Sequence, residues 1–246
     1  MKKILLISTG GTIASMPTDE GLTPKINSKK LLEYLNFTKL DFEIDTVNLL
    51  NVDSTDMQPK HWLKIKDEIK NNYEKYDGFV VTHGTDTMAY TASALSYLIQ
   101  NSQKPIVLTG SQKSIDMHIT DAKNNLLNSL LYASKNSSKG ISIVFDGKVI
   151  AGTRARKERT KSFDAFSSVN FPFLAIIQDE KIYRYINNED EDKEVKFYDS
   201  LNTNVFVLKL IPSMTAKILP EIFKNYDAII IESFGVGGIQ KTNIRV

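Results

Sequence analysis

The fold is decided by the first stretch of the chain, Lys2-Lys3-Ile4-Leu5-Leu6-Ile7-Ser8-Thr9-Gly10-Gly11-Thr12-Ile13-Ala14-Ser15. An apolar run of strand-forming residues ends in Thr-Gly-Gly-Thr, so a hydroxyl group follows the carboxyl end of a predicted buried strand. Open α/β sheets bind their ligands at that edge. The two glycines permit a sharp turn and let a substrate come close to the backbone. Taken alone, the stretch fits a strand followed by an ordinary turn equally well.

A second polar stretch follows another apolar strand. It reads Thr82-His83-Gly84-Thr85-Asp86-Thr87-Met88 and continues directly from the predicted strand Gly78–Thr82. Because two such stretches occur in one chain, a functional interpretation of the first is favoured over an ordinary turn.

Length and composition indicate a globular protein. The 246 residues allow one large domain or two small ones, and 41% of them are hydrophobic. No apolar stretch approaches the roughly 20 residues of a membrane span. Ile4–Ile7 is too short for a signal-peptide core of about 7–15 residues. The chain has no cysteine, which excludes disulfides, a thiol nucleophile and thiolate metal ligands. A net charge of only +2 is too small to argue for nucleic acid, so we expect no nucleic-acid partner. The lack of a long apolar stretch predicts no membrane partner, and the absence of cysteine is compatible with the cytoplasm.

Strands and helices alternate along most of the chain. This order predicts an α/β fold with a large open, mainly parallel sheet and helices on both faces. Ser28 is the expected N-cap of the first helix, and Pro59 is expected in the first turn of the second. The predicted strands are Ile4–Ser8, Phe42–Leu50, Gly78–Thr82, Ile106–Thr109 and Gly140–Phe145, the last followed by a hairpin, and the predicted helices are Ser28–Tyr34, Gln58–Asn72, Thr87–Ile99 and Thr120–Ser134.

An acidic segment without an apolar period divides the chain. We predict a large N-terminal catalytic domain over residues 1–185, a solvated acidic linker over 186–204, and an incomplete small α/β domain over 205–246. The predicted elements of the small domain are the strand Val205–Leu210, the helix Ala216–Asn225 and the strand Ala228–Glu232.

Four polar residues could together carry out acyl transfer: Thr12, Thr85, Asp86 and Lys157. A threonine hydroxyl is a poor nucleophile unless a base takes its proton. A lysine can take that proton only where burial or nearby positive charge lowers its pKa. With a carboxylate to orient the lysine, such a set would act on an amide or an ester. The alternatives are structural: Thr85 or Asp86 could cap the following helix, and Lys157 could be a surface lysine in a basic loop.

The three histidines do not form a metal-ligand pattern. His61, His83 and His118 are not spaced at i, i+4, so we assign no metal site and expect no cofactor. His61 is expected on a helix face beside Trp62. His83 is expected to orient the loop before Thr85 rather than to transfer a proton.

Several stretches form a further pattern: Thr9–Ser15, His83–Met88, Asp53–Met57, Thr109–Gln112, and Gly152–Lys157 followed by Ser162–Phe166. In this order they resemble the two signature motifs, the substrate-carboxylate loop, a strand end and the lysine loop of the bacterial-type L-asparaginases, and the resemblance covers nearly the whole chain. The missing signal peptide and the Ser54-Thr55 pair point to the cytoplasmic type I branch of that family.

The resemblance implies a role for each candidate residue. Thr12 would be the attacking nucleophile, and Thr85, Asp86 and Lys157 would form a relay. Asp86 would also face the substrate's α-ammonium group. Ser54, with Thr55 beside it, would bind the α-carboxylate, and the backbone at Ser111 would meet the side-chain amide. Backbone N–H groups near Thr12 and Thr85 would help to stabilise the oxyanion.

The resemblance also implies a substrate and an assembly. The substrate would be L-asparagine, with L-glutamine as a second possibility, and members form dimers or tetramers whose active sites are completed by a neighbour's small domain. No cofactor is implied.

The chain departs from the family pattern at three places. Leu22 stands where many members have a tyrosine, and the segment Gln112-Lys113-Ser114 lacks their proline. Members continue past the segment corresponding to Gly237-Gly238 into most of a second domain, so we expect a C-terminally truncated member. Two functions therefore stay open: an asparagine amidohydrolase, or a non-catalytic remnant that binds amino acids weakly.

Overall fold

The computed structural model describes residues 1–18, 21–24, 26–35, 41–186 and 193–239, and side chains within residues 16–25 are not described. Part of the predicted acidic linker, residues 187–192, and the side chain of Leu22 therefore lie outside the described part. The chain forms two compact units, Met1–Asp199 and Ser200–Val246, and each has a sheet of its own.

The first unit is built on an eight-stranded sheet with the order β13-β12-β9-β8-β7-β5-β1-β4. Five neighbouring strands run parallel, as predicted, and three antiparallel strands complete one edge. The parallel strands are β1 (Lys2–Gly10), β4 (Phe42–Val52), β5 (Gly78–Thr82), β7 (Pro105–Thr109) and β8 (Gly140–Phe145), and the antiparallel strands are β9 (Lys148–Ala151), β12 (Ala175–Gln178) and β13 (Lys181–Arg184).

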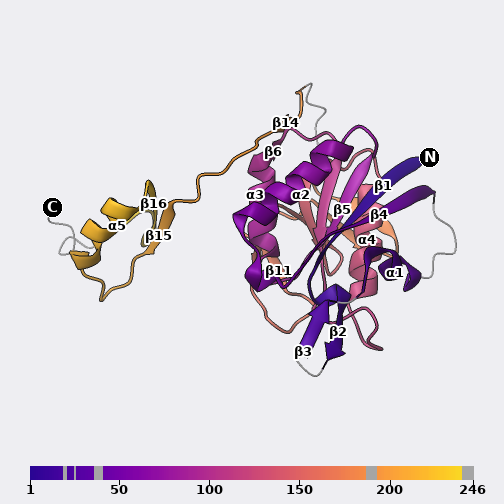
Figure 1. Ribbon diagram of the computed structural model, residues 1–246, viewed down its shortest axis with the longest axis horizontal. Coiled ribbons are helices and arrows are strands. Elements are labelled where there is room, and N and C mark those ends of the chain that lie inside the picture. Colours follow the sequence, from indigo (N-terminus) through magenta and orange to yellow (C-terminus); the bar gives the residue numbers. More distant parts are fainter. Residues whose placement is uncertain (19–20, 25, 36–40, 187–192, 240–246) are drawn as a thin grey trace. The chain divides into compact units, whose positions relative to one another are not determined.

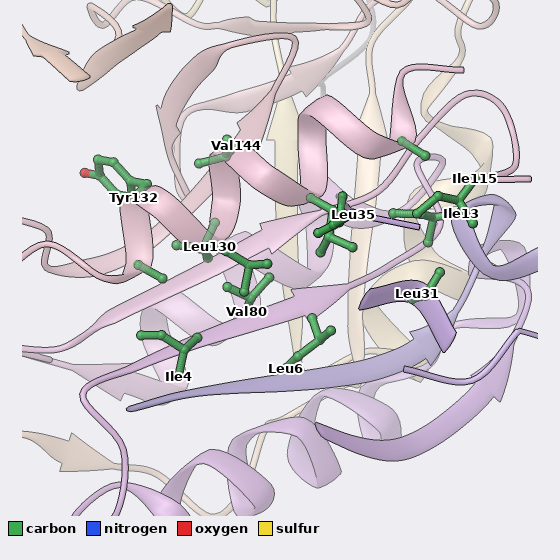
Figure 2. Close-up of a cluster of buried hydrophobic side chains, with 14 of the residues drawn as sticks. Ile4, Leu6, Ile13, Leu31, Leu35, Val80, Ile115, Leu130, Tyr132 and Val144 are labelled. Atoms are coloured by element: carbon green, nitrogen blue, oxygen red, sulfur yellow. The ribbon is translucent and has the colours of Figure 1, made fainter. Parts of the chain in front are cut away.

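Helices cover both faces of this sheet. Helices α2 (Pro59–Asn72) and α3 (Met88–Leu98) lie on one side, and α1 (Ser28–Glu33) and α4 (Ala122–Ala133) lie on the other (Figure 1). Successive strand residues point to opposite faces. The side chains of Ile4, Leu6 and Val80 therefore join Leu130 of α4 in one buried cluster (Figure 2). The predicted α/β fold is confirmed.

The register of the sheet brings three strand ends to one level. Ser8 of β1 pairs with Thr82 of β5, and Thr82 pairs with Thr109 of β7. The polar stretches after these strands must therefore meet at the carboxyl edge of the sheet, where ligands bind in open α/β folds.

One detail of the predicted helices is wrong, and one structural alternative is excluded. Asn27, not Ser28, is the N-cap of α1, because its side chain accepts the Lys30 N–H at 2.8 Å, while the Ser28 N–H binds Asn48. Neither Thr85 nor Asp86 caps α3, whose N-cap is Thr87 without a side-chain capping bond.

The sequence patterns did not indicate the short strands of the first unit. The hairpin of β2 (Ser15–Thr18) and β3 (Gly21–Pro24) follows the short 3-10 helix η1 (Thr12–Ala14), and the hairpin of β10 (Ala155–Lys157) and β11 (Phe166–Ser168) carries the candidate lysine. Two further strands, β6 (Ile99–Gln100) and β14 (Lys196–Phe197), pair with each other. Strand β14 lies within the stretch predicted as linker but belongs to the first unit.

The second unit contains few buried side chains. Its parallel strands β15 (Val205–Lys209) and β16 (Ala228–Glu232) are connected through η3 (Ala216–Ile218) and α5 (Leu219–Asn225). The single helix predicted over residues 216–225 is thus a 3-10 turn followed by a short α-helix. Among the described apolar residues of this unit, Leu208 and Ile222 are buried, whereas Val207, Ile230 and Phe223 are more than half exposed.

No helix among the described residues is long and apolar enough to cross a membrane.

Candidate active site

Two glycines bring the loops of Thr12 and Thr85 into direct contact. Thr12 begins η1 immediately after Gly11, whose φ of 80° is readily adopted by glycine. A Cβ atom on Gly11 would lie 2.3 Å from the backbone nitrogen of Gly84. Only a residue without a side chain permits that approach, so the backbones before Thr12 and Thr85 touch each other.

A third loop packs onto the same glycine. Ser54 lies in the 3-10 helix η2 (Ser54–Asp56) after β4 and is 4% exposed. A Cβ atom on Gly84 would lie 2.6 Å from Ser54 Oγ, so this contact also requires glycine. Thr87 Oγ1 donates a hydrogen bond to the Ser54 carbonyl oxygen at 2.6 Å. The loops after β4, β1 and β5 thereby form one packed edge.

Lys157 joins two residues of this edge. Its Nζ lies 2.7 Å from Thr85 Oγ1 and 2.6 Å from Asp86 Oδ1. The side chain of Lys157 is only 13% exposed, so the alternative of a solvent-facing lysine is wrong. The structure thus brings three of the four predicted catalytic residues into hydrogen-bond contact, and the glycine contact connects them to the loop of Thr12.

This arrangement can move a proton between a hydroxyl and an amine. The Asp86 side chain is 56% exposed, so water weakens its ion pair with Lys157 and leaves one carboxylate face open to a ligand. An amine within hydrogen-bond distance of both a hydroxyl and a carboxylate has the geometry expected of a base that activates an oxygen nucleophile.

Gln112 is a site residue that the sequence analysis did not single out. Its Oε1 accepts a hydrogen bond from Thr85 Oγ1 at 3.3 Å, and its Nε2 donates to the carbonyl oxygens of Arg159 and Ser162 at 3.2 and 3.0 Å. Its side chain therefore connects Thr85 to the loop that follows Lys157. The signal was its place in the Thr109–Gln112 stretch, directly after a strand end.

The remaining predicted binding residues differ in exposure. Ser111 is fully buried, and its hydroxyl donates to the Lys113 carbonyl oxygen, which leaves its backbone as the part that could face a substrate. Thr55 is exposed, and its hydroxyl donates to Asp53 Oδ1 at 2.8 Å.

The N–H groups of Gln112 and Lys113 donate to Asp121. Burial nevertheless raises the pKa of the Asp121 carboxyl, against the opposing effect of these donors.

The buried ring of His83 lies beneath the same edge. Its Nδ1 is 2.7 Å from the Gly84 carbonyl oxygen, and its Nε2 is 2.8 Å from Thr91 Oγ1. Burial lowers the pKa of His83 to about 4, so the ring is neutral at pH 7.

His61, by contrast, forms a capping box at the start of α2 with Gln58. In the described part of the chain, no group of three His, Cys, Asp or Glu side chains could hold a metal ion.

Known proteins resemble this chain in sequence and in fold. Residues 3–190 match the family model "Asparaginase, N-terminal". An L-asparaginase from Thermococcus kodakarensis is 36% identical over 96% of this chain and 72% of its own length. The solved structure of the thermostable L-asparaginase from that organism superposes with a TM-score of 0.91, at 35% identity, over 98% of this chain and 74% of that one.

Two further relatives are similar to this chain over most of its length. L-asparaginase 1 of Escherichia coli K12 is 33% identical over 96% of this chain and 72% of its own length. One subunit of a glutamyl-tRNA(Gln) amidotransferase from Pyrococcus abyssi is 34% identical over 96% of this chain and 57% of its own length. The fold and these similarities define the class of the protein, which is an amidohydrolase. Within that class, the chain belongs to the asparaginase family.

Proposed function

We propose that this protein hydrolyses the side-chain amide of L-asparagine to L-aspartate and ammonia, with Thr12 as the nucleophile. The observation that carries the proposal is the contact of Lys157 Nζ with both Thr85 and Asp86. The contact between Gly11 and Gly84 connects this group to the loop of Thr12.

The reaction has two halves. In the first, Thr12 Oγ1 bonds to the carbonyl carbon of the substrate, the carbon–nitrogen bond breaks, and the hydroxyl proton passes to the leaving ammonia. In the second, water attacks the resulting ester, the bond to Thr12 breaks, and one proton of the water returns to Thr12 Oγ1. Thr85 and Lys157 exchange protons with the reacting groups, and Asp86 orients Lys157.

The proposed substrate contacts combine one charged group with neutral hydroxyl and backbone groups. Asp86 has an exposed carboxylate face for the α-ammonium group. Ser54 and its neighbour Thr55 are assigned to the α-carboxylate, and the backbone at Ser111 to the side-chain amide. Backbone N–H groups near Thr12 and Thr85 would stabilise the oxyanion, because donors already fixed in place stabilise charge as it develops.

The test is ammonia release from L-asparagine and L-glutamine by the purified 246-residue chain. We expect turnover of L-asparagine. Thr12→Ala should lower kcat by roughly three orders of magnitude or more, whereas Thr12→Ser keeps a hydroxyl and should retain measurable turnover. A Thr12→Ala variant with most of the parent's kcat would remove Thr12 from the mechanism.

The other candidate function is weak binding of amino acids without turnover. It would be indicated if calorimetry detected L-asparagine binding while no ammonia was released. The sparsely buried second unit favours this alternative, because the resemblance assigns the completion of the active site to the small domain of a neighbour.

The domain organisation and setting of the protein belong to the same proposal. Residues 1–185 would be the catalytic domain, 186–204 a linker, and 205–246 would belong to a small domain. By the resemblance to the type I branch, the protein would be a cytoplasmic homo-oligomer that acts on a small amino acid.

A further inference from the structure

A row of hydrogen bonds leads from two helices to the peptide that precedes Thr85. Trp62 of α2 donates its Nε1–H to Thr91 Oγ1 at 2.9 Å. Thr91 of α3 contacts His83 Nε2 at 2.8 Å, and His83 Nδ1 contacts the Gly84 carbonyl oxygen at 2.7 Å. Thr91 and His83 are both fully buried.

The two ends of this row, together with the neutral ring between them, fix the direction of every hydrogen bond in it. An indole N–H can only donate, and a carbonyl oxygen can only accept. Thr91 Oγ1 therefore accepts from Trp62, and His83 Nδ1 must carry the proton that it donates to the Gly84 carbonyl oxygen. A neutral ring has no second proton, so Nε2 accepts the proton of the Thr91 hydroxyl. Burial lowers the pKa of His83 to about 4, in agreement with a neutral ring.

The last acceptor connects this row to the candidate active site. The Gly84 carbonyl and the Thr85 N–H belong to one planar peptide group. A donor at the carbonyl fixes the plane of that group and polarises it, which strengthens the N–H as a donor. The same residue, Thr85, presents its hydroxyl to Lys157.

We propose that Trp62 and Thr91 are positioning residues, which act through the Nδ1-protonated form of His83 to hold the Gly84–Thr85 peptide in its active orientation. The effect on catalysis rests on the function proposed above. The ring form and the state of the peptide do not depend on turnover and can be measured separately.

The first measurement is nitrogen-15 NMR of the intact protein. With three histidines and one tryptophan in the chain, the ring and indole signals are few. We expect His83 to carry its proton on Nδ1 at pH 7 and the Trp62 indole proton to exchange slowly with solvent. A proton on Nε2, or a doubly protonated ring, would overturn the proposal in the parent protein, before any variant is made.

The second measurement compares Thr91→Val, which removes the hydroxyl, with Thr91→Ser, which keeps it. Thr91→Val should shift the Thr85 amide signal, speed its exchange, and lower kcat roughly five- to tenfold with KM within about twofold. Thr91→Ser should restore all of these. Ser96→Ala is the matched control, since it removes a hydroxyl of α3 that donates to the Ala92 carbonyl instead.

The possible outcomes separate this inference from the proposed function. If Thr91→Val leaves the Thr85 amide unchanged, or if Thr91→Ser fails to restore it, the positioning role is wrong. If the amide responds as expected but the parent chain releases no ammonia, the positioning role stands and the proposed hydrolysis fails.

Discussion

His83 should make the folded first unit sensitive to acid. Its pKa is lowered from 6.5 to about 4 by burial, so the folded protein takes up this proton only near pH 4, whereas the unfolded chain takes it up near 6.5. The contribution of the neutral His83 ring to the free energy of unfolding is therefore fully present above pH 6.5. It is lost progressively as the pH drops toward 4. Between pH 7 and 4.5 the loss from this one group amounts to about 2 kcal/mol.

The assay is urea unfolding at pH 7 and at pH 4.5, followed by tryptophan fluorescence. Trp62, the single tryptophan, lies in the first unit, so the signal reports on that unit. His83→Asn should be less stable than the parent at pH 7 but should lose about 2 kcal/mol less on acidification. The control is His118→Asn, which replaces an exposed histidine and should follow the parent. Equal acid losses in the parent and in His83→Asn would refute the reasoning.

Three further predictions concern the relay, the substrate contact and the second unit. Lys157→Met should lower kcat roughly a hundredfold or more, whereas Lys161→Met, at an exposed position, should change kcat little. Equal, small changes of kcat in both variants would exclude the relay. Asp86→Asn should raise KM for L-asparagine about tenfold or more, because the α-ammonium group loses its ionic partner. Where KM reports binding, an unchanged KM would exclude the contact between Asp86 and the α-ammonium group. Hydrogen exchange and limited proteolysis should affect residues 200–239 before the first unit, because most of their apolar side chains are exposed, and equal protection of both units would contradict this.

The sheet was predictable because its strands are apolar runs bounded by turn residues. Gly78–Thr82 and Gly140–Phe145 coincide with the predicted strands. Strand β10 was not predictable by the same rule, since Ala155-Arg156-Lys157 has no apolar alternation and its extended form depends on pairing with β11. The N-cap of α1 was misassigned because two residues of capping type, Asn27 and Ser28, are adjacent, and the cap depends on which side chain accepts the Lys30 N–H.

The candidate site was predictable as a set of residues but not as a geometry. Motif resemblance identified Thr12, Thr85, Asp86 and Lys157 as candidates. The burial of Lys157 could not be read from its basic surroundings in the sequence, because it arises from contact with residues more than 70 positions earlier. Gln112 was missed for the same reason, since its position is fixed by hydrogen bonds to Thr85, Arg159 and Ser162, which are distant in the sequence.

The contact between Gly11 and Gly84 has a mechanical consequence. Because the two backbones touch with no side chain between them, neither loop can move toward the other without displacing it. Lys157 reaches Thr85 from a separate hairpin, and the hydrogen bonds that hold it there run through long side chains. Thermal motion should therefore change the gap between the lysine and Thr85 more than the gap between the loops of Thr12 and Thr85. Misplacement by about 1 Å can slow an enzymatic reaction a hundredfold. In the proposed mechanism, the rate would therefore depend on the stiffness of the β10–β11 hairpin.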